Sequence, residues 1–187
     1  ASIIIIIGES MKRKLPITSS FIESIKALVD PHTIELMKRN EIYTKVELES
    51  CAEIYYDNYS KTINIEAKTM IDMASKQYIP SVMKYMNNLA ETINNMKTAS
   101  DKVDTSVVEK TLTDISKLLS EAKQALEKLK LKINEAEDNK DVAKKAMFYR
   151  KEIIPIMEDL RKPIDELELL VGSNLWPVPS YGALMFK

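Results

Sequence analysis

Glycine, histidine and cysteine are scarce in this chain, and each scarcity removes a class of site. Three glycines in 187 residues cannot supply a Gly-rich phosphate loop, and neither GxGxxG nor GxxxxGK occurs. His32 is the only histidine, which excludes a histidine-pair zinc motif. Cys51 is the only cysteine, so no internal disulfide forms, and we expect a small core residue in a reducing compartment. The sequence therefore predicts no catalytic, cofactor-binding or metal-binding residue in this chain.

Net charge and long apolar runs are lacking too. The formal charge is −1, from 27 Lys plus Arg against 28 Asp plus Glu, so no basic excess points to nucleic acid. No apolar run approaches the roughly 18 residues of a membrane-spanning helix. The opening ASIIIIIGES is too short for a signal peptide and lacks its basic region. We expect a cytoplasmic protein with neither a nucleic-acid nor a membrane partner.

The first 17 residues contain the one segment with strand character. Ile3 to Ile7 are β-branched throughout and are followed by Gly8, a pattern that favours a buried strand. A lone strand needs partners, and left unpaired it promotes aggregation. We interpret residues 1–17 as a head that belongs beside strands of a domain missing from this chain.

Short helices follow the head and begin at recognisable caps. Ser20 with Glu23 forms a capping-box pattern. Asp30 caps a second helix with Pro31 in its first turn, and Asn40 is the expected stop. These signals open a helical bundle that we expect to span residues 18–172.

A long helical segment begins at a second capping box, Thr44 with Glu47. Pro80 should bend it, because proline removes a backbone hydrogen bond and crowds the preceding turn, so we expect two coaxial segments that meet near Ile79. Along the whole segment, on both sides of Pro80, apolar residues recur at steps of three or four, which is helical spacing. They are Leu48, Ala52, Tyr55, Tyr59, Ile63, Ala67, Met70, Ala74, Tyr78, Val82, Tyr85, Leu89, Ile93 and Met96. We assign the tyrosines and methionines to packing.

The next helix carries a coiled-coil seam in which steps of four and three alternate strictly. Its members are Val108, Leu112, Ile115, Leu119, Ala122, Leu126, Leu129, Ile133 and Ala136. Asp141 can cap the following helix, which should run to Gly172 with kinks at Pro155 and Pro163. A short connection favours antiparallel neighbours. The predicted fold is all-α, an elongated antiparallel helical bundle with a coiled-coil hairpin.

Residues 173–187 form a Pro/aromatic tail that we interpret as a docking arm. Its prolines favour an extended chain, and its aromatic and aliphatic side chains offer apolar area. The candidate interaction residues are Trp176, Pro177, Pro179, Tyr181, Leu184 and Phe186. Packing of the tail on its own bundle and docking on another chain or domain both stay open.

Glu49 and Glu53, one turn apart, fit a solvated helix surface better than a shared cation.

Four segments, in order, resemble the C-terminal part of type III glutamine synthetases, the large form of that enzyme. They are LVDPHTIELMKRNEIYTKVELES (28–50), YSKTINIEAKTMIDMASKQYIP (59–80), YRKEIIPIMEDLRKPIDELELLV (149–171) and LWPVPSYGALMF (175–186). The last is similar to that family's terminal Trp-Pro-x-Pro-x-Tyr motif. The segment 100–140 matches only in character.

The resemblance implies a parent enzyme that joins ammonia to glutamate with ATP and Mg²⁺ and assembles as stacked hexameric rings. In that family the catalytic residues lie upstream of everything matched here, so none is carried onto this chain. The expected function is a noncatalytic helical module, inactive alone, that packs on the catalytic domain and supports oligomer assembly. The alternative is an independent coiled-coil adaptor that binds a partner helix.

Overall fold

The structure is a computed structural model that describes residues 12–13, 20–179 and 184–185. The described residues form helices and connecting turns without a strand, so the all-α prediction is confirmed. The chain forms two compact units, the first of residues 1–61 and 140–147 and the second of residues 62–139 and 148–187. The strand expected at residues 3–7 lies outside the described residues. The division into head, bundle and tail stays a prediction.

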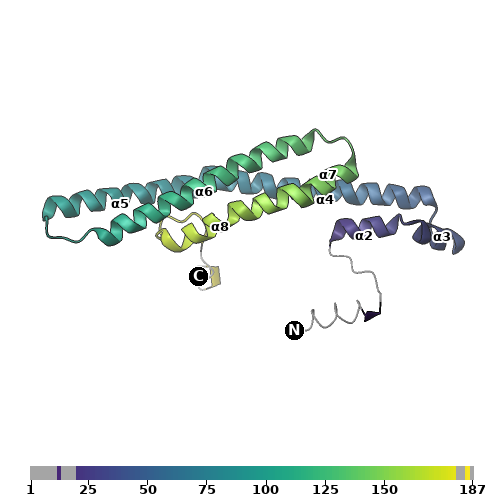
Figure 1. The fold of residues 1–187 in the computed structure, drawn as a ribbon, viewed down its shortest axis with the longest axis horizontal. Coiled ribbons are helices and arrows are strands. Elements are labelled where there is room, and N and C mark those ends of the chain that lie inside the picture. Colours follow the sequence, from purple (N-terminus) through teal and green to yellow (C-terminus); the bar gives the residue numbers. More distant parts are fainter. Residues whose placement is uncertain (1–11, 14–19, 180–183, 186–187) are drawn as a thin grey trace. The chain divides into compact units, whose positions relative to one another are not determined.

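The first unit contains α2 (Phe21–Leu28), α3 (Pro31–Arg39), the beginning of α4 (Lys45–Met73) and most of α7 (Val142–Phe148) (Figure 1). Three of its helices begin where side chains satisfy free backbone N–H groups. The Ser20 hydroxyl accepts from the Glu23 amide at 3.3 Å, and the Asp30 carboxylate accepts from the His32 amide at 2.9 Å. Asp141 accepts from the Ala143 and Lys144 amides, each at 3.0 Å. These predicted caps are confirmed.

The capping box at the start of α4 is also confirmed. The Thr44 amide donates to the Glu47 carboxylate at 2.7 Å, and the Glu47 amide donates to the Thr44 hydroxyl at 3.3 Å. The Thr44 hydroxyl donates to the same carboxylate at 2.8 Å. The hydrogen bonds donated by the Thr44 amide and hydroxyl lower the pKa of Glu47. The reciprocal pair fixes the residue at which the long helix starts.

A small apolar core holds the first unit together. Ile22, Ile25, Ala52, Tyr56 and Ala146 are buried in one cluster. They come from α2, α4 and α7, so this core joins elements that are distant in the sequence. On the surface beside it, Phe21 of α2 packs its ring against the rings of two α4 tyrosines, Tyr55 and Tyr59.

The second unit is built from the rest of α4, the π-helical turn η1 (Ala74–Tyr78), α5 (Ile79–Ala99), α6 (Ser106–Glu137), the π-helical turn η2 (Tyr149–Ile153) and α8 (Ile154–Leu170) (Figure 1). α6 packs along α8 and along α5. The predicted seam accounts for the core, because Ile115, Ala122, Leu126, Leu129, Ile133 and Ala136 are all buried. The three remaining seam residues, Val108, Leu112 and Leu119, are half-buried.

Both π-helical turns stand immediately before an Ile-Pro pair. The Ile79 amide donates to the carbonyl of Ala74, and the Ile154 amide donates to the carbonyl of Tyr149, five residues back in each case. The prolines that follow, Pro80 and Pro155, have no N–H, and the proline ring crowds the carbonyl four residues earlier. A wider turn relieves that crowding. The sequence placed a helix junction near Ile79 correctly but did not predict its π-helical form.

α8 continues as a helix through its second proline. Pro163 is buried within the Ile154–Leu170 helix, together with Ile156, Leu160, Ile164 and Leu167.

Within the described ranges, no helix combines the length and the apolar content that crossing a bilayer requires.

Candidate functional site

The tail leaves the second unit through a tight turn after α8. The Gly172 carbonyl accepts hydrogen bonds from the Leu175 amide at 2.9 Å and the Trp176 amide at 3.2 Å. A Cβ at Gly172 would lie 2.8 Å from Asn174 Oδ1. A larger residue there would displace only the end of the exposed Asn174 side chain.

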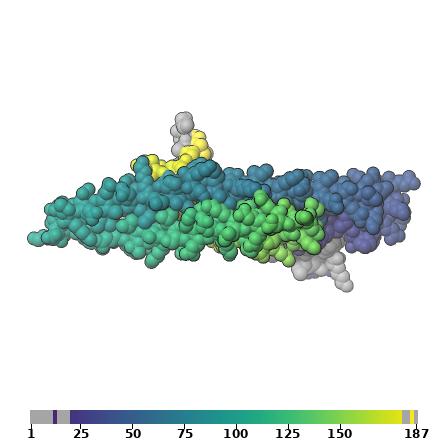
Figure 2. Space-filling view, turned by 90° about the horizontal axis from the view of Figure 1, so that it is seen from above, coloured from purple at the N-terminus to yellow at the C-terminus, as the bar shows by residue number. Residues whose placement is uncertain are grey.

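The turn delivers Trp176 to the ring of Tyr78, the last residue of η1. The two ring centroids are 5.1 Å apart and the ring planes are inclined by 33°, within the range of favourable aromatic pairs. Trp176 is half-buried as a result. In Figure 2 the yellow tail lies on the surface of the second unit, against the helical segment that contains η1.

Tyr78 also lines an apolar groove, which we call the η1–α8 groove. It has a volume of about 310 Å³ and opens to solvent. Side chains from the end of α4, from η1 and from α8 form its walls: Met70, Met73, Ala74, Tyr78, Leu160, Arg161, Ile164 and Asp165. The tryptophan contact and the groove thus share one tyrosine.

Charged groups stand at the α8 side of this groove. Arg161 Nε donates to Asp165 Oδ2 at 3.1 Å, an exposed pair one helical turn apart. Burial raises the pKa of Tyr78, and the nearby carboxylates of Glu168 and Asp165 raise that pKa further. Tyr78 is therefore a neutral phenol at neutral pH, and the groove combines apolar walls with the Arg161–Asp165 ion pair on its α8 side.

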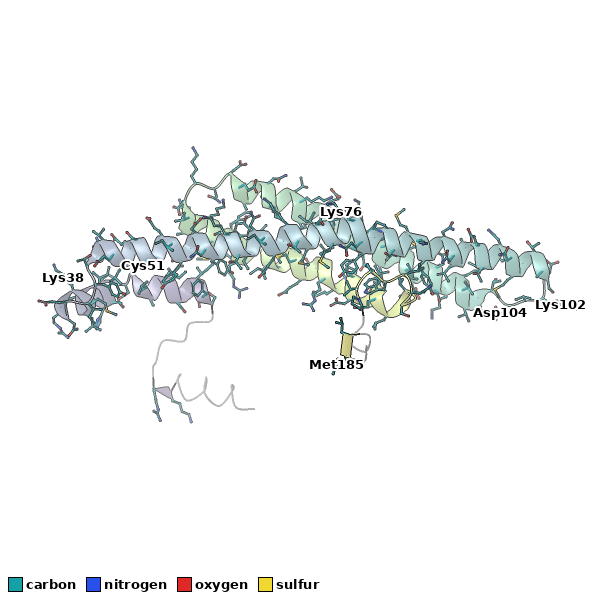
Figure 3. The ribbon with its side chains drawn as sticks, turned by 180° about the vertical axis from the view of Figure 1, so that it is seen from behind. Lys38, Cys51, Lys76, Lys102, Asp104 and Met185 are labelled. Atoms are coloured by element: carbon teal, nitrogen blue, oxygen red, sulfur yellow. The ribbon has the colours of Figure 1, made fainter. Side chains whose placement is uncertain are left out.

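The predicted interaction residues have different surroundings in the structure. Trp176 contacts Tyr78, whereas Pro177 and Pro179 are exposed. Leu184 is 60% exposed, and its neighbour Met185, labelled in Figure 3, is 72% exposed and lies clear of the helices. Tyr181 and Phe186 lie outside the described residues. The docking role of the tail as a whole stays a prediction.

Sequence reasoning missed the receiving side of this site. The periodicity assigned Tyr78, Met70 and Met73 to packing, and it gave no sign that they form an open groove beside the tail. The only available signal was the placement of Tyr78 two residues before Pro80, where a helix is prone to distortion.

The carboxylates singled out on α4 line a separate, open pocket of the first unit. Glu49, Glu53 and Asp141 are among its lining residues, and its volume is about 700 Å³. Glu49 pairs with Lys45 at 3.6 Å, and Asp141 caps α7. Among the described residues no three His, Cys, Asp or Glu side chains come together as metal ligands.

The chain has recognisable relatives. Residues 7–97 match the family model described as the glutamine synthetase C-terminal domain. A glutamine synthetase from Butyrivibrio fibrisolvens is 30% identical over 97% of this chain and 26% of the relative. A type-3 glutamine synthetase from Dictyostelium discoideum is 30% identical over 88% of this chain and 23% of the relative. A glutamine synthetase from Bacteroides fragilis is 24% identical over 95% of this chain and 25% of the relative.

The described residues form an all-α module, and residues 7–97 of the chain match the glutamine synthetase C-terminal domain. The resemblance seen in the sequence is confirmed by this match and by glutamine synthetases that align with most of the chain. The chain spans about a quarter of the length of the curated relatives that it matches.

Proposed function

We propose that this chain is the noncatalytic C-terminal helical module of a glutamine synthetase. In this proposal the module packs on the catalytic domain of the same enzyme and supports its assembly into a homo-oligomer of stacked rings. The parent enzyme joins ammonia to glutamate with ATP and Mg²⁺. The observation that carries the proposal is the alignment of nearly the whole chain with about a quarter of each glutamine synthetase.

The surface of the first unit offers an area for such packing. Ile42 is 58% exposed, Val46 is 70% exposed and Ile54 is 57% exposed. Val46 and Ile54 are eight residues apart on α4, which places them within about 80° of each other around the helix axis. Exposed apolar side chains on one side of a helix are suited to contact with another domain. We assign this surface to the catalytic domain.

ATP and Mg²⁺ do not fit the described residues of this chain. The carboxylates are scattered over helix surfaces without a cluster of three potential ligands. No glycine-rich loop is present in the sequence to hold phosphate groups. In this proposal both groups bind in the catalytic domain.

The tail is the second element that we assign to assembly. Trp176 already ties its first part to Tyr78, while Leu184 and Met185 remain uncovered. Uncovered apolar residues at the end of an anchored segment suit docking, because the anchor lowers the entropy lost when the rest is ordered. The independent adaptor, the alternative function, does not account for the alignment with glutamine synthetases across both units.

Assembly of the parent enzyme tests the proposal. We expect Val46→Asp combined with Ile54→Asp to shift the oligomer toward smaller species in native mass spectrometry, because charge would be buried at the contact. Val107→Asp is the matched control, since Val107 is 73% exposed on α6. Unchanged circular dichroism would show that the helices persist. Equal oligomer distributions for the double variant and the control would contradict the assembly role.

The noncatalytic role has a separate test. We expect the purified 187-residue chain to form no glutamine from glutamate, ammonia and ATP with Mg²⁺. The complete parent enzyme is the positive control. Glutamine formation by the chain alone, above that of a heat-inactivated sample, would show that the chain carries an active site.

A further inference from the structure

We propose that the η1–α8 groove receives the apolar end of the tail of the same chain, residues 184–187. The inference rests on the docking role proposed for the tail and names the surface that it contacts. With residues 184–187 in the groove of their own chain, the tail would serve assembly as part of the folded module and not by reaching into a second subunit. Four observations support the inference, taken from the anchor, the reach of the chain, the apolar surfaces and the charges.

The anchor places the tail at the rim of the groove. Trp176 packs on Tyr78 at 5.1 Å between ring centroids, and Tyr78 is itself a wall of the groove. The chain that follows Trp176 therefore starts beside the groove. Tethering of this kind gives the following segment an effective concentration in the millimolar range. A segment of the same chain thus has an advantage over any partner free in solution.

The length of the tail is sufficient for this contact. Eight residues lead from Pro177 to Leu184, and at about 3.3 Å per residue they span up to roughly 26 Å when extended. That reach exceeds what a groove adjoining Tyr78 demands. The prolines at positions 177 and 179 restrict the intervening chain, which reduces the entropy lost on docking.

Both apolar surfaces are uncovered. Leu184 and Met185 are exposed to 60% and 72%, and the groove that they would enter is walled by Met70, Met73 and Ile164 among others. Methionine side chains adapt their shape to an incoming apolar group. Docking removes both surfaces from water at once, which is the driving force for the contact.

Charge complements the apolar match. The sequence at the end of the tail is Leu-Met-Phe-Lys, so a cation, Lys187, follows the apolar residues. Asp165 of the groove is already paired with Arg161, and Glu168 lies close enough to Tyr78 for its carboxylate to raise the tyrosine's pKa. With its apolar residues in the groove, the tail can place Lys187 near Glu168.

Disulfide trapping in the 187-residue chain tests the contact. In a Cys51→Ser background, Leu184→Cys is paired with Met73→Cys in the groove. The control pairs Leu184→Cys with Leu131→Cys, because Leu131 is 65% exposed on α6 and is no part of the groove. Oxidation should form an intramolecular disulfide at least tenfold faster in the groove pair. That advantage should survive dilution and should fall when Trp176→Ala or Lys187→Glu is added.

A second measurement avoids any new cysteine in the groove. A thiol reagent should label a single Leu184→Cys variant several-fold faster when Met73→Asp is also present, because the charge would expel the tail. A disulfide rate equal to the control pair together with an unchanged labelling rate would overturn the proposal. Cross-linked dimers without the intramolecular product would also overturn it, because the tail would then enter a second copy.

The outcome is separable from the proposed function. Assembly of the parent enzyme lacking residues 180–187 measures the docking role of the tail independently. If that truncation weakens assembly but the groove disulfide does not form, the docking role stands and the tail docks on a surface other than the groove. If trapping succeeds and the truncated enzyme assembles normally, the groove holds the tail but the tail does not serve assembly.

Discussion

The two π-helical turns of the second unit share one local cause and have different surroundings. Each is followed by an Ile-Pro pair, in the segments KQYIP (76–80) and KEIIP (151–155). In η2, Tyr149 and Ile153 are completely buried, and the turn packs on α6. In η1, only Ala74 is buried, and Tyr78 faces both the tail and the open groove.

This difference teaches that the distortion alone does not define a site. Proline widens the turn in both places, because its ring crowds the carbonyl four residues earlier. What distinguishes η1 is that neighbouring helices cover it only in part and that Trp176 of the tail packs on it. We therefore regard η2 as part of the core and η1 as the part of the second unit that the tail contacts, which we call the tail-binding turn.

The largest expected effect concerns the buried turn. Ile153→Ala should lower the free energy of unfolding by about 2–5 kcal/mol, because it leaves a cavity in a packed core. Ile65→Ala on α4, where the side chain is 66% exposed, should change it by less than about 0.5 kcal/mol. Urea unfolding followed by circular dichroism measures both. Similar small losses for the two variants would mean that η2 is not core.

A double-mutant cycle sharpens the case for η1. Tyr78→Ala and Trp176→Ala should each destabilise the chain modestly, and together they should show a coupling of about 0.5–1.5 kcal/mol, typical of an aromatic pair. The pair Tyr78→Ala with Leu169→Ala is the control, since Leu169 is 86% exposed. Purely additive effects of the Tyr78 and Trp176 substitutions would contradict the role of η1 as the tail-binding turn.

A smaller effect is expected from the hydroxyl group in η2. Tyr149 is buried, and its hydroxyl finds no hydrogen-bond partner among the described residues. Tyr149→Phe should therefore be neutral or stabilising by up to about 1 kcal/mol, since it removes a desolvated polar group. Tyr78→Phe, in the partly open turn, should be close to neutral. A clear destabilisation by Tyr149→Phe in thermal unfolding would reveal a partner for that hydroxyl.

Alkaline pH gives the smallest expected effect and tests the buried turn η2. Burial raises the pKa of Tyr149 above the ordinary value of 10.0, and the carboxylate of Glu137 raises it further. The unfolded chain ionises first as pH rises past 10.0, so the stability linked to the neutral phenol is present below that pH and is lost above it. The stability advantage of Tyr149→Phe over the parent chain should grow above pH 10. A pH-independent difference would contradict the raised pKa.

The sequence predicted the features that depend on neighbours along the chain. The caps at Ser20, Asp30, Thr44 and Asp141 each require only a side chain and an amide two or three residues away, so local patterns suffice. The α6 seam was predicted equally well, because a strict three-four alternation has one helical interpretation.

The features that depend on distant residues were not predictable. Proline at position 80 indicates a distorted helix, but the choice of a π-helical turn depends on how the surrounding helices accept an extra residue. Trp176 was predicted to dock, but the residue that it contacts was not predicted, because Tyr78 lies far from it in the sequence. Open grooves arise from three-dimensional packing and leave no periodic signature.

Hydrogen exchange in the presence and absence of the tail tests most directly whether η1 is the tail-binding turn. Amides of residues 74–79 and 149–154 are compared by mass spectrometry in the 187-residue chain and in a variant that lacks residues 173–187. We predict that exchange becomes several-fold faster at 74–79 and stays unchanged at 149–154, because only η1 loses a contact. Unchanged exchange in both segments, or an equal increase in both, would contradict this account.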